Sequence, residues 1–476
     1  MKKVKIKSGI LRHINNNTVF KEGGRQMYEN KVGFLDGALA TVKKNQMQDT
    51  IGQIQKSGRL ILKGGHVVDP KNKIDKQTDI LIADGIVCQV ADDIAAETGD
   101  RVIDCEGLTV LPGLVDMHLH LGDLFEVSTN PIFCAAEDGV TLGLSPGAGN
   151  TFMAPSLLGA EVDHGVPINL GVYLGAANVL GTQMSVDELI RMFKGEIDAD
   201  TLSAKMTRNG ITNTTAALTV GIKDHMGHFI MSDENIDKIY EITSKANLIY
   251  MSHTQDPEHA ERLVSLAKGR PLHLAHATAA GCGTHMGAAE GMKRVLDLVN
   301  GDNISAEFVT TMLRAGRGSR EGLQLPKESQ KLAYDALESG KVKILISDGQ
   351  NQGTMKGFGD TRDNIPAIIE LSQSGVLSLS DAVATMTCNP AALIGNRTAN
   401  NWWTDKIGHL GVGALANVTV VDMDDKLATY TIVNGEIVSF ENRAVRRNCG
   451  AGGWISKFGM VRKTGVGELV MFSYQK

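Results

Sequence analysis

The sequence has no long apolar run and no excess of positive charge. No segment of its 476 residues approaches the ~18 consecutive apolar residues that a membrane-spanning helix needs. Lys and Arg total 48 against 54 Asp and Glu, so the net charge is -6 and no basic surface for nucleic acid or an anionic membrane is indicated. The first lysines are not followed by the apolar stretch of a secretory signal. We therefore expect a cytoplasmic protein without nucleic-acid or membrane partners.

Cysteine is also scarce. The six cysteines are scattered, and no two stand in a Cys-x-x-Cys pair. This pattern predicts neither a disulfide framework nor a closed structural zinc site with thiolate ligands. It fits reduced thiols in a cytoplasm.

The middle of the chain alternates apolar strands with helical patterns, which is typical of repeated βα units. The strands are predicted at residues 114–120, 140–145, 167–174, 215–223, 247–253, 271–276, 303–309 and 342–348. The helices are predicted near residues 130–138, 185–194, 235–246, 257–268, 286–299, 327–339 and 362–374. Eight such units predict an α/β fold, a (β/α)8 TIM barrel, over residues 113–404.

Short strands closed by Gly, Pro and Asp precede the barrel and return after it. We predict a smaller β-sandwich domain built from both chain ends, residues 58–112 and 405–440. Residues 1–57 and the tail 441–476 stay unassigned. Either could pack on a neighbouring subunit, and the first could equally be a loosely ordered leader.

The first barrel strand ends in Val-Asp-Met-His-Leu-His, which contains His118 and His120. Residues two apart on a strand share a face, so both imidazoles would point the same way. An isolated His-x-His is more often a pair of half-buried strand histidines than half of a metal site. Four further metal-competent side chains at later strand ends favour the metal site, because barrel enzymes place their chemistry there. They are Lys223, His253, His276 and Asp348.

The order His-x-His, Lys, His, His, Asp inside a split β-domain resembles the two-metal members of the amidohydrolase superfamily. The resemblance covers about residues 57–440. It implies that His118, His120 and Asp348 hold one of two divalent ions. Imidazole and carboxylate ligands suit Zn, which we expect first, or Mn or Fe.

The same resemblance implies that His253 and His276 hold the second ion and that Lys223, carboxylated by CO2, bridges both. Burial at an apolar strand end and nearby cations favour the unprotonated lysine that reacts with CO2. The alternative is an ordinary lysine that reaches the surface. The ions would turn a shared water into a bridging hydroxide. Asp348 would be the catalytic acid and base, taking a proton from the hydroxide and passing it to the leaving nitrogen.

Other histidines are weaker candidates. His225 and His228, just beyond the lysine, could reach the site, but we expect them on a surface loop. His273 lies in the same strand, shortly before His276. An alternative assignment would give these two histidines different roles, although the position at the strand end favours His276 as the ligand. His285 could line the mouth of the barrel.

The resemblance to dihydroorotases and hydantoinases implies hydrolysis of a C–N amide bond in a cyclic amide or ureide. A hydantoin, a dihydropyrimidine or an oxidised purine such as xanthine would be suitable small-molecule substrates. Dihydroorotases usually carry an arginine directly after His-x-His to bind a carboxylate, whereas this chain has Leu121-Gly122-Asp123. We therefore expect a substrate other than dihydroorotate. By the same resemblance, we expect a homodimer or homotetramer.

An alternative is an acyclic N-acyl-amino-acid deacylase or an acetyl-ester hydrolase. The stretch 144–155 resembles N-acyl-D-amino-acid deacylases, whose typical members lack the strand-four lysine. A non-catalytic scaffold is a remote alternative, because scaffold relatives lose metal ligands and none is missing here. An arginine-rich segment after strand seven could hold an anionic or carbonyl-rich substrate, or could be a solvated basic loop. The predicted substrate-binding residues are Asn150, Thr278, Arg314, Arg317 and Gln350.

Overall fold

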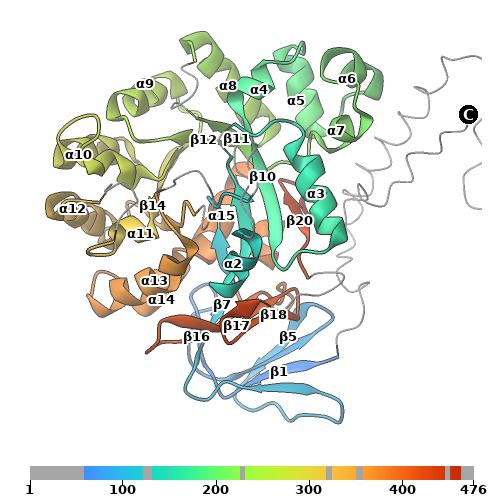
Figure 1. Ribbon diagram of the computed structural model, residues 1–476, viewed down its shortest axis with the longest axis vertical. Coiled ribbons are helices and arrows are strands. Elements are labelled where there is room, and N and C mark those ends of the chain that lie inside the picture. The colour runs from blue at the N-terminus through green and yellow to red at the C-terminus, as the bar shows by residue number, and fades with distance from the viewer. Residues whose placement is uncertain are drawn as a thin grey trace, which may run out of the picture.

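A computed structural model shows a barrel above a smaller two-sheet domain (Figure 1). The structure describes residues 58–121, 131–147, 149–225, 231–317, 324–349, 358–444 and 451–461. No helix within these ranges has both the length and the apolar character needed to cross a membrane.

Eight parallel strands form the nearly closed barrel. They are β8 (Leu114–Asp116), β9 (Val140–Ser145), β10 (Asn169–Gly175), β11 (Gly221–Asp224), β12 (Ile249–His253), β13 (Leu272–Ala275), β14 (Ile304–Val309) and β15 (Ile344–Ile346). Each strand pairs with the next in parallel, and a bridge between Leu119 and Gly349 joins the last strand to the first. This arrangement confirms the predicted TIM barrel.

One group of helices surrounds the barrel. They are α2 (Pro131–Glu137), α3 (Ala154–His164), α5 (Val186–Lys194), α8 (Asp233–Ala246), α9 (Pro257–Ala267), α10 (Ala288–Leu298), α12 (Lys327–Glu338) and α13 (Asn364–Gln373). Local sequence sets their ends. At the start of α5, Ser185 and Glu188 form a reciprocal capping box, and Gly195 ends the helix in the left-handed conformation.

Shorter helical segments fill the loops. They are α4 (Ala176–Leu180), α6 (Ala199–Lys205), α7 (Gly210–Thr215), η3 (Ala277–Cys282), α11 (Thr310–Leu313) and η4 (Thr361–Asp363). The prediction that strand four begins at residue 215 is wrong, because α7 occupies the segment before it. The Asn209 side chain caps α7 by accepting the backbone N–H groups of Ile211 and Thr212.

The amino ends of the barrel strands are covered by helices that follow the barrel in sequence. These helices are α15 (Cys388–Thr398) and α16 (Trp402–Lys406), and the preceding helix α14 (Leu379–Ala384) contacts α13 and β2 (His66–Asp69). The Arg397 guanidinium in α15 donates to the carbonyls of Asp302 and Asn303, which directly precede β14. Trp403 is fully buried against the same barrel interior. This cover leaves the carboxyl ends of the strands as the place for a site.

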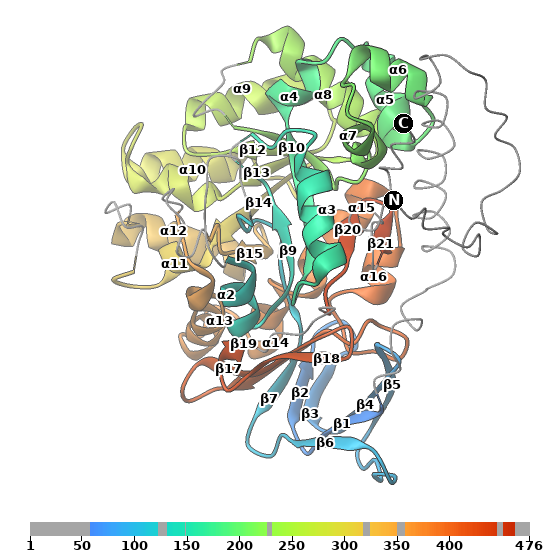
Figure 2. The same ribbon diagram turned by 45° about the vertical axis from the view of Figure 1, so that its right-hand side comes forward.

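The smaller domain is built from both chain ends, as predicted. One sheet has the order β5-β4-β1-β6, and the other β19-β18-β17-β16-β7-β2-β3. In the second sheet, β7 pairs antiparallel with β16, so segments far apart in sequence lie side by side (Figure 2). The strands from the first segment are β1 (Leu60–Lys63), β2 (His66–Asp69), β3 (Ile74–Gln77), β4 (Asp79–Ala83), β5 (Ile86–Ala91), β6 (Arg101–Asp104) and β7 (Thr109–Pro112). Those from the second are β16 (Val418–Asp422), β17 (Leu427–Val433), β18 (Glu436–Phe440) and β19 (Arg443–Ala444).

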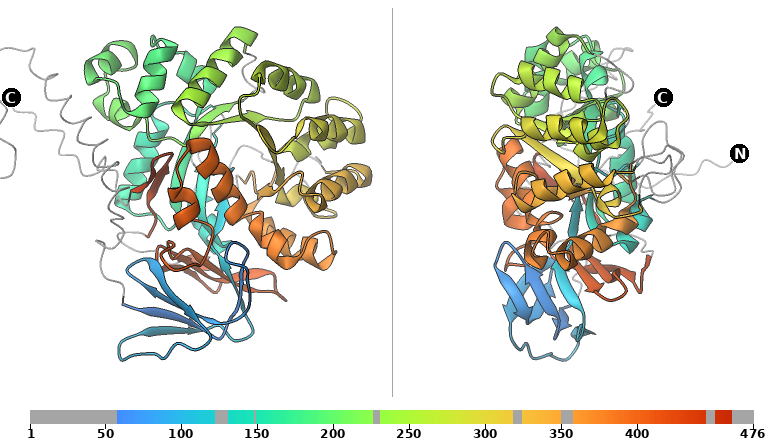
Figure 3. Two further views of the ribbon diagram at one scale, coloured as in Figure 1. Left: turned by 180° about the vertical axis from the view of Figure 1, so that it is seen from behind. Right: turned by 90° about the vertical axis from the view of Figure 1, so that its left-hand side faces the viewer.

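A hairpin from the C-terminal tail joins the barrel wall. It consists of β20 (Trp454–Ser456) and β21 (Gly459–Val461) and lies beside the barrel strands in Figure 3. Leu170 of β10 pairs with Trp454, whose indole Nε1 donates to the Leu218 carbonyl at 3.2 Å. The sequence leaves open that the tail packs on a neighbouring subunit, but Trp454 of the tail is buried within its own chain. β11 pairs with β10 only at Tyr173–Gly175, and β20 pairs with β10 nearer its amino end, at Leu170.

Candidate active site

The first strand end is tied to the last by backbone and carboxylate hydrogen bonds. The Asp348 N–H donates to the His118 carbonyl, and the His120 N–H to the Gly349 carbonyl, both at 3.0 Å. The buried Asp116 carboxylate accepts the N–H groups of His118 and Ser347 at 3.3 Å. The chain therefore brings the two histidines and Asp348 together across the closing seam of the barrel.

His118, His120 and Asp348 form a compact and buried cluster. The Asp348 Oδ1 atom lies 3.0 Å from His118 Nε2 and 3.2 Å from His120 Nε2. One ligand atom from each residue lies within 4.8 Å of the others. Burial alone would raise the pKa of Asp348, but the two histidines hold it well below its usual range. Asp348 is therefore an anionic carboxylate beside two imidazoles.

Lys223 lies at the centre of the cluster, on β11. Its side chain is almost fully buried, and Nζ is 2.9 Å from His118 Nε2. A small cavity adjoins it. The cavity is lined by Gly149, Gly175, Ala176, Ala177, Asp224, His225 and Met231.

His253 and His276 complete the set from the ends of β12 and β13. Their ring centroids are 4.5 Å apart, and the His276 ring is 5.2 Å from that of His118. Burial, with a contribution from Lys223, lowers the pKa of His253 to about 3, and burial also lowers that of His276. Both imidazoles are therefore neutral, with lone pairs available. The structure thus brings all six predicted metal ligands together at one end of the barrel.

Two of these positions have an unusual backbone. His276 has φ 37° and Asp348 has φ 47°, the left-handed region that residues other than glycine rarely adopt. Such conformations cost of order 1–3 kcal/mol each and cluster at functional sites. Here they turn both side chains at the ends of their strands.

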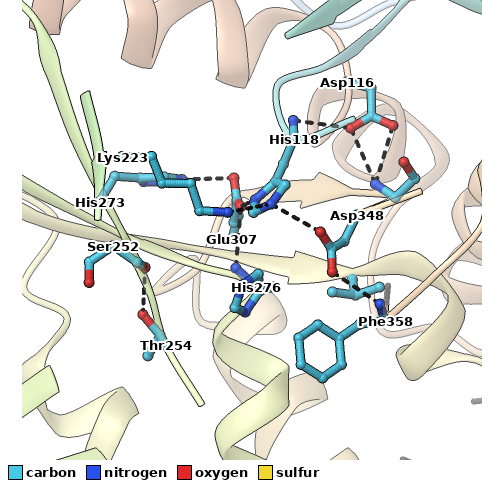
Figure 4. Close-up of polar contacts among 12 residues, drawn as sticks. Asp116, His118, Lys223, Ser252, Thr254, His273, His276, Glu307, Asp348 and Phe358 are labelled. Atoms are coloured by element: carbon cyan, nitrogen blue, oxygen red, sulfur yellow. Dashed lines mark hydrogen bonds and ion pairs between the residues drawn. The ribbon is translucent and has the colours of Figure 1, made fainter. Parts of the chain in front are cut away.

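Glu307, which is not among the predicted site residues, is fully buried on β14. Its carboxylate contacts His118 Nδ1, His273 Nε2 and the His276 N–H (Figure 4). Burial opposes ionisation of this group, but His118 and His273 lower the pKa of Glu307 to about 2. A signal was present in the sequence, because a glutamate inside the apolar run Ile-Ser-Ala-Glu-Phe-Val must find buried partners. His273 therefore contacts Glu307 and is not one of the six predicted metal ligands.

Two further residues lie beside the ligands. His225, which we expected on a surface loop, is half-buried with its ring 5.2 Å from that of His253. Phe358 lies 4.9 Å from the His276 ring, and its N–H donates to Asp348 Oδ2 at 3.1 Å. His285 is exposed, and His228 lies outside the described residues.

Two predicted substrate-binding residues are buried and engaged in the barrel wall. The Asn150 side-chain amide donates to the carbonyls of Ser145 and Tyr173 at 3.3 and 3.1 Å. The Thr278 hydroxyl accepts the Val309 N–H at 3.2 Å. These contacts link neighbouring strand ends, which gives both side chains a structural role in this structure.

The predicted arginines form ion pairs instead of extending freely into the mouth. Arg314 binds Glu370 through two hydrogen bonds of 2.9 and 2.8 Å and also pairs with Asp363. Arg317 binds the same Asp363 carboxylate at 3.1 Å. Their guanidinium charges are thus already balanced by carboxylates. Gln350, the fifth predicted residue, lies outside the described residues.

The donor set fits divalent metal ions. The Nδ1 atoms of His253 and His276 are buried and have no hydrogen-bond partner among the described residues. A buried, unpaired imidazole nitrogen is costly unless a proton donor or a cation meets it. Imidazole nitrogens and a carboxylate, without thiolates, suit Zn, Mn or Fe.

A barrel with such ligands at its strand ends has the architecture of the metal-dependent barrel enzymes. A family model confirms this class: residues 109–439 match the amidohydrolase family, and the chain belongs to it. It is therefore an amidohydrolase, as the sequence motif predicted.

The relatives are named dihydroorotases. That of Geobacter sp. (strain M21) is 26% identical over 412 residues, which cover 76% of this chain and 89% of the relative. That of Geobacter sulfurreducens is 26% identical over 383 residues, 71% of this chain and 85% of the relative.

Solved structures with the same fold include a D-hydantoinase, with a TM-score of 0.62 and 16% identity over 84% of this chain and all of the other. The L-hydantoinase from Arthrobacter aurescens has a TM-score of 0.59 and 18% identity over 83% of this chain and 99% of the other.

Proposed function

We propose that this enzyme hydrolyses a C–N bond in a cyclic amide or ureide with the help of two divalent metal ions. The observation that carries the proposal is the meeting of His118 Nε2, Lys223 Nζ and Asp348 Oδ1 within hydrogen-bond distance, in a family of amidohydrolases. Relatives that are dihydroorotases, and fold neighbours that are hydantoinases, support a cyclic substrate.

In this proposal, His118, His120 and Asp348 hold one ion and His253 and His276 hold the other. Lys223, carboxylated by CO2, would bridge both ions through a carbamate, whose single negative charge is shared by two oxygens. The almost complete burial of the lysine favours its neutral form, which reacts with CO2. Zn is the proposed metal, with Mn and Fe as alternatives for this ligand set.

When bound, the ions lower the pKa of water and polarise the scissile carbonyl. Asp348 acts as general base and then as general acid, passing the proton from water to the leaving nitrogen. Its position supports this role, because Oδ1 meets the strand-one histidines while Oδ2 accepts the Phe358 N–H. The Phe358 ring offers a flat apolar surface next to His276, which suits a flat or nearly flat ring such as xanthine, a hydantoin or a dihydropyrimidine.

A substrate panel tests the reaction class. Metal-loaded protein would be assayed with hydantoins, dihydrouracil, dihydroorotate, xanthine, and N-acetyl and N-formyl amino acids. Ring opening without deacylation supports the proposal. Release of free amino acids from the acyclic compounds alone would replace it by a deacylase function.

A variant tests the bridging lysine. We expect Lys223→Ala to lower kcat by at least about 10²-fold, because the carbamate and its two oxygens are lost. Lys457→Met is the matched control, since this buried lysine lies away from the site and donates to the Ala246 carbonyl at the end of α8. A 13C carbamate signal after exposure to 13CO2 should appear in wild type and be absent from Lys223→Ala. Full turnover by Lys223→Ala would refute the mechanism.

We also infer a cytoplasmic homodimer or homotetramer. The net charge and the cysteine pattern support the location, and the resemblance to oligomeric barrel hydrolases supports the assembly. Light scattering during size-exclusion chromatography measures the assembly directly, and a mass of 51.0 kDa would contradict it.

A further inference from the structure

We propose that Glu307 is a positioning residue that orients ligands of both metal ions through one carboxylate. This inference rests on the proposed metal site and deepens it. The carboxylate is fully buried on β14, the one barrel strand between β13 and β15, and it contacts a ligand side chain and a ligand backbone (Figure 4).

The first contact sets the tautomer of His118. The Oε1 atom of Glu307 meets His118 Nδ1, so Nδ1 carries the proton and donates. The lone pair is then left on Nε2, the atom that faces Asp348 Oδ1 at 3.0 Å and Lys223 Nζ at 2.9 Å. A carboxylate behind an imidazole orients the ring and makes the metal-binding nitrogen more basic.

The second contact holds the chain at His276. The same Oε1 atom accepts the His276 N–H at 3.2 Å. His276 has the left-handed backbone, and its N–H cannot join the strand ladder beyond β13, which ends at Ala275. Glu307 therefore helps to keep the backbone turn that directs the His276 ring. One oxygen atom thus links a ligand of the first ion to a ligand of the second.

The third contact fixes the carboxylate itself. Oε2 of Glu307 accepts from His273 Nε2 at 2.9 Å, and His273 Nδ1 lies 2.9 Å from the Ser305 hydroxyl. A series of hydrogen bonds, Ser305–His273–Glu307–His118, thus runs from within the barrel to the proposed metal ligands. With three donors and no exposed surface, the carboxylate has no freedom to turn away.

A purely structural role makes a different prediction. A buried carboxylate that only stabilises the barrel would, when replaced, lower the stability of the metal-free protein and leave metal affinity unchanged. A positioning role affects metal affinity first. Glutamine is the suitable replacement, because its carbonyl can still accept from His118 while the amide faces a His273 that changes tautomer.

The test compares metal binding by Glu307→Gln, wild type and Asp69→Asn. Asp69 is an equally buried carboxylate in the sandwich domain, where it accepts the Leu410 N–H at 2.7 Å. By chelator competition with Zn, we expect Glu307→Gln to raise the dissociation constants about 10–100-fold, because the neutral amide keeps an acceptor but removes the negative charge that makes His118 Nε2 more basic. Asp69→Asn should lower thermal stability without changing metal affinity.

Wild-type protein gives a second readout that does not depend on a variant that folds. In metal-free protein at pH 9, 15N histidine spectra should show His118 with its proton on Nδ1. A proton on Nε2 instead would overturn the inference, as would unchanged metal affinity in Glu307→Gln. If wild type itself binds no metal, the proposed function fails, which is a distinct result.

Discussion

Single buried carboxylates organise the polar contacts of this barrel. Asp116 accepts three groups across the closing seam, Glu307 accepts three at the ligands, and Asp363 balances two arginines. An ionised carboxylate has two oxygens, each able to accept more than one hydrogen bond, and it has no donor of its own, so one side chain can accept from several groups at once. Removing one of them leaves several buried donors unpaired, so their loss is more costly than that of a surface carboxylate.

Asp138, directly after α2, should make stability depend on pH. Burial, and then the nearby Asp360, raise the pKa of Asp138 from 3.8 to about 7, although the Thr361 hydroxyl donates to it at 2.5 Å. The folded state thus binds the proton more tightly than the unfolded state does. The stabilisation is complete below about pH 4 and is lost as the pH rises towards 7.

We therefore expect Asp138→Asn to match wild type near pH 4 and to be more stable by about 1–2 kcal/mol at pH 8. This gain in the free energy of unfolding is smaller than the whole pKa shift would give, because the side chain keeps some contact with solvent. Urea unfolding at several pH values measures it. The exposed Glu338→Gln is the control and should show no such gain, and a gain of equal size at pH 4 and 8 would contradict the assignment.

At the scale of elements, the hairpin β20–β21 is part of the barrel wall. Strand β20 pairs with β10, and the N–H of Lys457, in the turn of the hairpin, donates to the Thr219 carbonyl at 2.9 Å. The hairpin therefore bridges β10 and the segment that precedes β11. A strand that satisfies these backbone groups also excludes water from the gap between them. The hairpin should therefore stabilise the barrel although it lies near the end of the chain.

Trp454→Ala should lower the free energy of unfolding by about 3–5 kcal/mol, since it leaves a cavity where a fully buried indole packs. Trp454→Phe should cost less, because it mainly removes the hydrogen bond to Leu218. Urea denaturation measures both. Val412→Ala, at a side chain that is 70% exposed, should change stability by less than about 0.5 kcal/mol. A Trp454→Ala variant as stable as wild type would show that the hairpin does not support the barrel.

At the scale of the whole molecule, the proposed metal ligands come from strands far apart in the chain. His118 and Asp348 meet only when β8 and β15 close the barrel. Lys223 joins them from β11, the fourth barrel strand along the chain. Bound ions would therefore cross-link the folded barrel and would have no comparable site in the unfolded chain.

Removing divalent ions should therefore lower the melting temperature. Each site would contribute about 2.7 kcal/mol when the free ion exceeds its dissociation constant 100-fold. Calorimetry with and without chelator measures the change. His120→Ala, which lacks one ligand, should show a smaller difference between the two conditions. Identical melting of wild type with and without chelator would contradict metal binding.

Local sequence predicted much of the fold, because periodicity reports which face of an element is buried. The helix predicted over 185–194 is α5, whose Ser185 and Glu188 cap is visible in the sequence. The strand predicted over 140–145 has the bounds of β9. The start of strand four was wrong, because an apolar stretch with threonines suits a strand and a short capped helix equally well.

By itself, the sequence determined the barrel, the split sandwich and the six residues that meet at the strand ends, because strand periodicity and chain order place them at equivalent positions. Only the tertiary structure decided the partners of buried polar groups. Glu307 meets His118, and Arg314 meets Glu370, through contacts between residues far apart in sequence. Such pairings depend on how elements far apart in the sequence pack together, and local sequence patterns do not encode that packing.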